Sequence, residues 1–199
     1  VHEIVPFQQK QWEIINDEDG VQAAIRIARS FPTRKHPDFP KVQVLNALFG
    51  GFFGSRLMTN IREDKGYTYG IYSGFDGNKQ NGSFIIQASV RTNATDSALR
   101  EINKELLNYV NKGISEEEVA FTKSSLLNSD ALKFETPMDK AGFLNRIVEY
   151  NLAKDYTSQQ NAILKNITKA DIDKAAKDFI HPDKMVIVVV GNKYLIKKP

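Results

Sequence analysis

The chain has 199 residues, of which 41% are hydrophobic and 26% charged, and its formal net charge is +3; these values are typical of a soluble, folded protein. So small a charge, scattered along the chain, gives no support for nucleic-acid binding, and no apolar run reaches the roughly 20 residues that span a bilayer. The absence of cysteine excludes disulfides, thiolate catalysis and cysteine-ligated zinc, and it is compatible with the cytoplasm and the periplasm alike.

The N-terminal residues 1–10 are expected to be a linker, because Pro6 and two adjacent glutamines interrupt any apolar period. The sequence begins at Val1 rather than methionine, which suggests a piece of a longer protein. Residues 11–199 are expected to form a single domain.

Two hairpins are predicted in the first half of the chain. Residues 12–17 and 21–31 are rich in β-formers and flank an EDG turn, so we expect a first hairpin at an edge of the sheet. Residues 67–75 and 82–91, separated by a turn-rich segment, predict the second hairpin.

Helices are predicted between and after these hairpins. The first should begin near Asp38 and end at Gly50 and Gly51, and the second should be capped by Ser55 and end at Gly66. Helical periodicity resumes at Thr92 and ends at Gly113. Further helices are predicted at Ser115 with Glu118, at Pro137, within residues 155–167, and from Thr168 with Asp171 to about Phe179.

The last element is the apolar run MVIVVVG, residues 185–191, which predicts a strand covered on both faces. The order of elements is a hairpin, two helices, a hairpin, several helices and a last strand. We therefore expect an α+β fold in which helices cover a largely antiparallel sheet.

Metal and phosphate motifs are not found. His2, His36 and His181 are too widely separated for H-E-x-x-H or H-x-x-E-H, so we predict no metal site in this chain. The glycine-rich GGFFGS, residues 50–55, lacks the lysine of a phosphate loop. We interpret it as a tight turn in which glycine supplies the backbone angles and the phenylalanines enter the core or an interface.

The stretch NIREDKGYTYG, residues 60–70, places Arg62 and Tyr69 seven residues apart. In one interpretation Arg62 pairs with Glu63 or Asp64 near a helix C-terminus, and Tyr69 is a half-buried aromatic of a strand. In the other, the guanidinium and the phenol point at one place, where they hold a peptide carbonyl or stabilise an oxyanion.

Residues 45–73, LNALFGGFFGSRLMTNIREDKGYTYGIYS, resemble the signature of the second, non-zinc half of M16 family metallopeptidases, the group of pitrilysin, insulinase and mitochondrial processing peptidase. Members of that family carry a glycine-rich turn, then SRL, then R-E-x-x-G-x-x-Y. The matching residues here are Ser55, Arg56, Leu57, Arg62, Glu63, Gly66 and Tyr69. The predicted order of elements fits a whole M16 repeat over roughly residues 10–195.

This resemblance implies the LuxS/MPP-like metallohydrolase fold and an enzyme of two homologous halves that close on an extended peptide. The first half of such enzymes carries H-x-x-E-H, the zinc ion and its activated water, and neither half cleaves alone. By position, Arg62 and Tyr69 would contact the backbone of the peptide substrate and the developing oxyanion, while zinc would lie in the partner half.

Two interpretations remain open. The chain is either the C-terminal half, or a separate accessory subunit, of a zinc peptidase, or it belongs to a non-proteolytic M16-like scaffold that binds peptides or assembles with other proteins. The presence of both Arg62 and Tyr69 favours the first, because a scaffold has no chemical need for that pair.

Overall fold

A five-stranded sheet forms the centre of the molecule. The structure is a computed structural model that describes residues 7–31, 33, 36–77, 82–130 and 134–196. Within these ranges the strand order is β1-β5-β2-β4-β3, and only the β1–β5 pair is parallel. The strands are β1 (Gln11–Asn16), β2 (Gln22–Phe31), β3 (Thr68–Gly77), β4 (Gly82–Arg91) and β5 (Val186–Gly191). The predicted α+β class with a mostly antiparallel sheet is confirmed.

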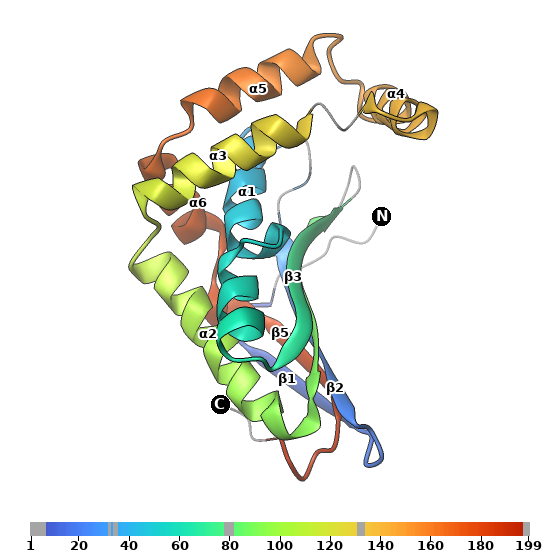
Figure 1. Cartoon of the computed structure of the whole chain (residues 1–199), viewed down its shortest axis with the longest axis vertical. Coiled ribbons are helices and arrows are strands. Elements are labelled where there is room, and N and C mark those ends of the chain that lie inside the picture. The colour runs from blue at the N-terminus through green and yellow to red at the C-terminus, as the bar shows by residue number, and fades with distance from the viewer. Residues whose placement is uncertain (1–6, 32, 34–35, 78–81, 131–133, 197–199) are drawn as a thin grey trace.

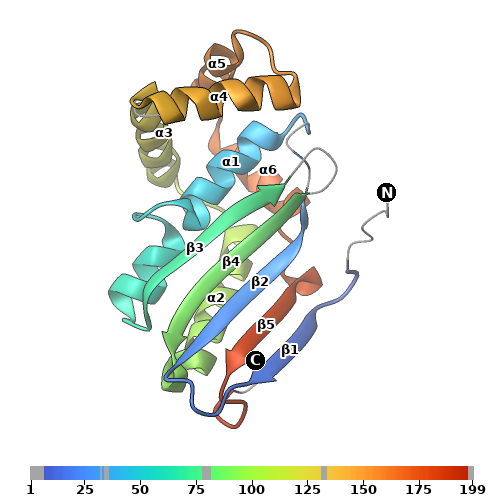
Figure 2. The ribbon, with the colours of Figure 1, turned by 90° about the vertical axis from the view of Figure 1, so that its right-hand side faces the viewer.

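Helices lie on one side of this sheet (Figure 1). Figure 2 shows the other face of the sheet toward the viewer, with α2 and α6 behind it, and α3, α4 and α5 together at one end of the molecule. The helical elements are α1 (Phe39–Asn46), η1 (Ala47–Gly51), η2 (Met58–Asp64), η3 (Thr92–Ala94), α2 (Thr95–Asn111), α3 (Glu116–Asp130), α4 (Pro137–Tyr150), α5 (Tyr156–Asn166), α6 (Lys169–Phe179) and η5 (Pro182–Lys184).

The predicted first hairpin is wrong, because β5 lies between β1 and β2. Val186 of β5 is the register partner of Gln11 on one side and of Ala28 on the other. An all-apolar strand stabilises the fold most in the middle of a sheet, whereas β1 has only half-buried or exposed residues and suits the edge. The edge position of this segment is as predicted.

The second hairpin is confirmed as the antiparallel pair of β3 and β4, with Ile71 opposite Ala88 and Phe75 opposite Phe84. Its turn falls largely on residues 78–81, which lie outside the described residues, as do residues 1–6 of the predicted linker.

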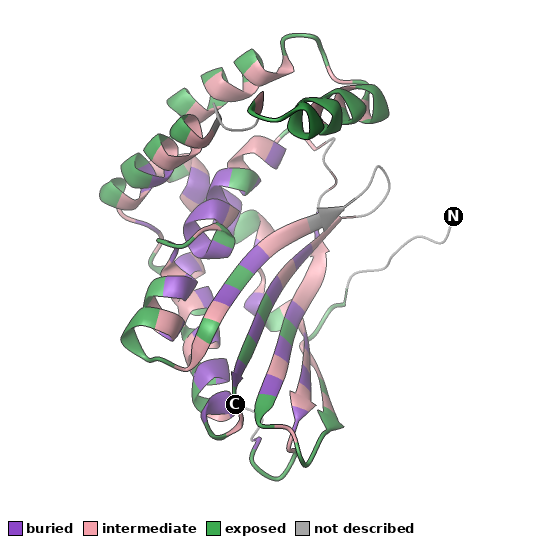
Figure 3. Ribbon diagram, turned by 45° about the vertical axis from the view of Figure 1, so that its right-hand side comes forward, coloured by how far each residue is buried: buried purple, intermediate pink, exposed green. Residues whose placement is uncertain are grey.

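The prediction that β5 is covered on both faces is also wrong. Ile187 and Val189 are buried under the helices, but Val186, Val188 and Val190 on the opposite face are only half-buried. Figure 3 shows this alternation along the strands of the sheet. The physical reason is that the described helices pack on one face alone (Figure 2).

The core forms between the covered face of the sheet and the helices behind it. Tyr109 of α2 is fully buried, and its hydroxyl donates to the Leu45 carbonyl of α1 at 2.8 Å. Other large, fully buried side chains include Ile25, Leu45, Phe49, Leu57, Met58, Ile61, Ile71, Phe84, Ile86, Leu99 and Ile102. Four of these residues, Phe49, Leu57, Met58 and Ile61, lie in η1, in η2 or directly before η2, so the segment around the predicted motif is anchored in the core.

Most predicted helix ends are confirmed. Gly66 and Gly113 adopt left-handed backbone angles, with φ of +61° and +75°, which glycine tolerates without strain. The predicted cap at Ser55 is wrong. Its hydroxyl is buried and has no hydrogen-bond partner among the described residues, because this residue faces the interior.

Candidate functional site

The candidate site lies where η2 ends and β3 begins. Met58 and Ile61 are completely buried, so one side of η2 is fixed in the core and Arg62 is left at its surface. The chain reverses at Gly66, and the Tyr67 amide donates to the Ile61 carbonyl at 3.0 Å. The end of η2 and the start of β3 are therefore held together by this bond.

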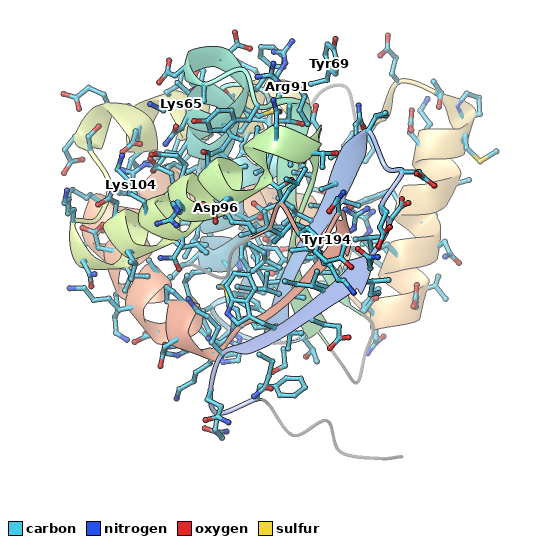
Figure 4. All side chains as sticks on the ribbon, turned by 90° about the horizontal axis from the view of Figure 1, so that it is seen from below. Lys65, Tyr69, Arg91, Asp96, Lys104 and Tyr194 are labelled. Carbon is cyan, nitrogen blue, oxygen red and sulfur yellow. The ribbon has the colours of Figure 1, made fainter. Side chains whose placement is uncertain are left out.

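Tyr69 is the second residue of β3, where the pairing of the strand with β4 is irregular. The register shifts between Thr68 and Ile71. The Thr68 hydroxyl donates to the Gly70 carbonyl at 2.9 Å and accepts from the Gly70 amide at 3.1 Å, which fixes the local backbone. Such bulges redirect side chains, and the Tyr69 side chain is 91% exposed (Figure 4).

Arg62 has two described contacts. Its Nη1 donates to the Glu63 carboxylate, and its guanidinium carbon lies 4.5 Å from the centre of the Phe53 ring. No contact among the described residues joins Arg62 to Tyr69. The ion pair is the one expected if Arg62 is structural, whereas the exposure of Tyr69 contradicts the expectation of a half-buried aromatic.

A second arginine, which the sequence analysis did not single out, lies at the same end of the molecule (Figure 4). The Arg91 Nη2 donates to the Gly66 carbonyl at 3.1 Å, and the Arg91 amide donates to the Tyr67 carbonyl at 3.2 Å. These bonds fasten the end of β4 to the link between η2 and β3. Arg91 is the last residue of a strand, and only the sheet register reveals its proximity to the motif.

The glycine-rich turn is required for close packing, not for unusual backbone angles. A Cβ at Gly50 would lie 2.5 Å from the Ser73 Oγ and 2.8 Å from the Ser73 amide nitrogen of β3. Gly50 is not among the residues with positive φ, so the expectation about backbone angles is wrong. Phe52 is half-buried, with its ring centre 5.7 Å from that of Phe121, and Phe53 is exposed. Neither enters the core, and their place in an interface stays a prediction.

Arg56 of the SRL triplet is a structural residue that the sequence analysis missed. Its Nη2 donates to the Glu118 carboxylate at 2.7 Å and to the Gly113 carbonyl at 2.9 Å. Glu118 also accepts from the Ser115 amide at 2.7 Å, which confirms the predicted capping box of α3. Arg56 thereby ties the residues just before η2 to the junction of α2 and α3. The capping box of Ser115 and Glu118 can be recognised in the sequence, but it does not predict that Arg56 pairs with Glu118.

The pKa of Glu118 reflects two opposing effects. Burial disfavours the charged carboxylate, but hydrogen bonds from Arg56 and from the Ser115 amide outweigh it, so the pKa of Glu118 lies below its usual value. The pKa of Arg56 is raised, because the bond to Glu118 outweighs the effect of burial. Both groups are therefore charged at neutral pH.

A groove of about 590 Å³ lies beside the candidate site, and its lining includes Asn60, Glu101, Glu105 and Phe121. The Asn60 amide donates to Glu105 at 2.7 Å and to Glu101 at 3.2 Å. Neither Arg62 nor Tyr69 lines this groove.

The described residues do not fit a metal ion. They contain no group of three or more histidine, cysteine, aspartate or glutamate side chains that could hold one. The His36 Nδ1 accepts from the Asp38 amide, and the His181 Nε2 contacts the Asp178 carbonyl, so these histidines have local contacts within loops and helix ends. In the part of the chain that the structure describes, no helix has the length and apolarity needed to cross a membrane.

Comparison with known proteins identifies the family. A family model described as "Peptidase M16 inactive domain" matches residues 3–126. The chain belongs to the M16 inactive-domain family. A crystal structure of a peptidase M16 inactive domain from Pseudomonas fluorescens superposes on the whole chain with a TM-score of 0.89 and 27% identity, and the match covers 47% of that protein. The predicted resemblance and the fold that it implied are confirmed.

Two sequence relatives have names that concern activity. The chain is 28% identical over 169 residues to "Probable inactive metalloprotease YmfF" of Bacillus subtilis, with 83% of the chain and 38% of that protein covered. It is also 28% identical over 191 residues to "Non-peptidase homolog YmxG" of Helicobacter pylori, with 92% of the chain and 43% of that protein covered. The chain thus spans about two fifths of the length of these curated relatives.

Proposed function

We propose that this M16 inactive domain is the half of a zinc peptidase that closes over an extended peptide and contacts it through Arg62 and Tyr69. The observation that supports this most is the exposure of Tyr69. A large aromatic side chain that is 91% exposed at a hydrogen-bonded bulge contributes little to the fold. This exposure, seven residues after an arginine at the surface, supports a contact between Tyr69 and a ligand.

The two side chains supply hydrogen-bond donors suited to a peptide carbonyl. A guanidinium carries five N–H donors in a planar fork, and the described contact with Glu63 uses Nη1. The Tyr69 hydroxyl adds one more donor. Donors aimed at a carbonyl oxygen orient the peptide, and they stabilise the negative charge that develops on that oxygen when the bond is attacked.

The partner in this proposal is a homologous half that carries the zinc motif, on the same chain or as a separate subunit. Since the described residues do not fit a metal, the metal and the catalytic base must come from that partner. The ratio of chain lengths supports a partner of similar size, because the match covers 47% of the Pseudomonas fluorescens protein.

The test is peptide hydrolysis by the full-length protein, together with any partner subunit, measured with a fluorescence-quenched peptide. Arg62→Ala and Tyr69→Phe should each lower kcat/KM by about 100-fold, which is typical of losing one oxyanion donor. Arg26→Ala is a matched control, because Arg26 is an exposed arginine on β2, outside the candidate site. Full turnover and normal peptide affinity in both site variants would overturn the proposal.

A second candidate function is a non-proteolytic scaffold that binds peptides or assembles with other proteins. The names of the two relatives, an inactive metalloprotease and a non-peptidase homolog, favour it. The decisive observation is whether H-x-x-E-H occurs within one domain length upstream in the coding region or in the neighbouring gene. If the motif is absent from both and the labelled peptide is bound without being cut, the scaffold function holds.

A further inference from the structure

Phe53 is an exposed aromatic residue in a turn that is otherwise attached to the body of the protein. The turn joins η1 to η2 and is closed by the Ser55 amide, which donates to the Phe52 carbonyl at 3.1 Å. Phe52 packs against Phe121 with ring centres 5.7 Å apart. Phe53 is 60% exposed, so burial in the core does not account for an aromatic residue at this position.

The turn leaves little space for a side chain at Gly54. A Cβ at Gly54 would come within 3.1 Å of the Phe52 ring and 3.2 Å of the Phe121 ring. The turn at Gly54 therefore lies directly against these two aromatic rings. The Phe53 ring centre is 4.5 Å from the guanidinium carbon of Arg62, within the range of a cation–π contact.

Glu63 also contacts the same guanidinium, because its carboxylate accepts from the Arg62 Nη1. The Arg62 side chain is 32% exposed, while that of Glu63 is 51% exposed. An arginine side chain that has no such contacts loses considerable rotamer entropy when a ligand orders it. A ring and a carboxylate that order it beforehand reduce that loss. The carboxylate also balances the positive charge of Arg62, which suits a neutral acceptor such as a peptide carbonyl.

We propose that Phe53 is a positioning residue that holds the Arg62 guanidinium ready for the carbonyl oxygen of a bound peptide. This inference rests on the proposed function, because it assumes that Arg62 contacts the peptide. It extends the site to the glycine-rich turn and assigns a role to an exposed phenylalanine that packing does not explain.

The experiment measures binding of a fluorescein-labelled casein peptide to the full-length protein by fluorescence anisotropy, with EDTA present so that the peptide is not cut. Phe53→Leu should raise Kd about threefold, the size of one exposed cation–π contact, without a change in Tm. Phe53→Trp should retain the wild-type Kd, because tryptophan binds cations at least as well as phenylalanine. In an Arg62→Ala background, Phe53→Leu should have no further effect.

The outcomes separate this inference from the proposed function. If Arg62→Ala weakens binding but Phe53→Leu does not, Phe53 has no positioning role and the proposed function stands. Equal losses from Phe53→Leu with and without Arg62 would mean that Phe53 acts on the peptide directly, which also overturns the inference. If Arg62→Ala leaves Kd unchanged, Arg62 does not hold the bound peptide and this inference fails, whereas the proposed function is decided by peptide hydrolysis in the Arg62 and Tyr69 variants.

Discussion

Arg56 and Glu118, separated by 62 positions in the sequence, form an ion pair that joins the residues just before η2 to the first turn of α3. Through this pair the geometry of the α3 cap and the position of the residues before η2 depend on the same carboxylate. Glu118 accepts from the Ser115 amide and from Arg56 at once. Arg56 in turn lies 5.1 Å from the centre of the buried Tyr109 ring. Arg56, Glu118, the Ser115 amide and the Gly113 carbonyl thus form one hydrogen-bonded cluster.

Glu118→Gln should destabilise the chain by about 2 kcal/mol, because hydrogen bonds to charged groups contribute about 1.5–3 kcal/mol. The amide keeps the shape of the capping residue but not its charge. Urea denaturation of the 199-residue chain measures the difference. Glu116→Gln, in the same first turn of α3 but exposed, is the control and should cost less than 1 kcal/mol. Equal losses in the two variants would show that the ion pair with Arg56 adds nothing.

The same pair predicts how stability depends on pH. Because the pKa of Glu118 is lower in the folded chain than its usual value, ionised Glu118 contributes stability above the unfolded pKa of about 4.3. That contribution is lost as pH falls through the folded pKa. The difference in unfolding free energy between wild type and Glu118→Gln should therefore be constant above about pH 5.5 and shrink below about pH 4.3. A difference that stays constant down to pH 3 would contradict this assignment.

Gly50→Ala should destabilise the chain by about 1–3 kcal/mol, the usual cost of overpacking. The new Cβ would meet the Ser73 amide nitrogen at 2.8 Å, and a backbone atom of β3 cannot move without disturbing the sheet. Gly74→Ala is the control. Gly74 follows Ser73 in β3, and a Cβ at Gly74 would meet nothing within 4 Å. The urea denaturation midpoints of the two variants are compared. A Gly50→Ala variant as stable as the wild type would show that the segment around Gly50 moves away from Ser73 at little cost.

Local signals predicted much of the fold but not its long-range pairing. Capping boxes such as Ser115 with Glu118 and glycine stops such as Gly113 act within one helical turn, so the sequence predicts them directly. The insertion of β5 between β1 and β2 depends on which strand gains most from a central position, and the short EDG turn indicated a hairpin instead. Close approach of Gly50 to Ser73 is likewise a contact between distant segments.

The candidate site was predicted in part for the same reason. The spacing of Arg62 and Tyr69 could be read from the sequence, and so could their placement at a helix end and a strand start. The ring of Phe53 over Arg62 and the bonds from Arg91 to the link between η2 and β3 arise from tertiary packing. No periodic pattern encodes such contacts, and the exposure of Phe53 appears only in the folded chain.

Tyr69→Phe should separate function from stability. Removing the hydroxyl from a side chain that is 91% exposed should change the unfolding free energy by less than about 0.5 kcal/mol, since no described hydrogen bond within the chain uses it. The same change should lower peptide hydrolysis by the full-length protein, because the lost donor faces the substrate in the proposed function.

Tyr72→Phe on the same strand, with a side chain that is 44% exposed, is the control and should leave both the unfolding free energy and the rate of hydrolysis near wild type. Thermal denaturation and kcat/KM are measured on each variant. A loss of stability in Tyr69→Phe as large as its loss of activity would mean that Tyr69 serves the fold, and the proposed contact with the peptide would have to be abandoned.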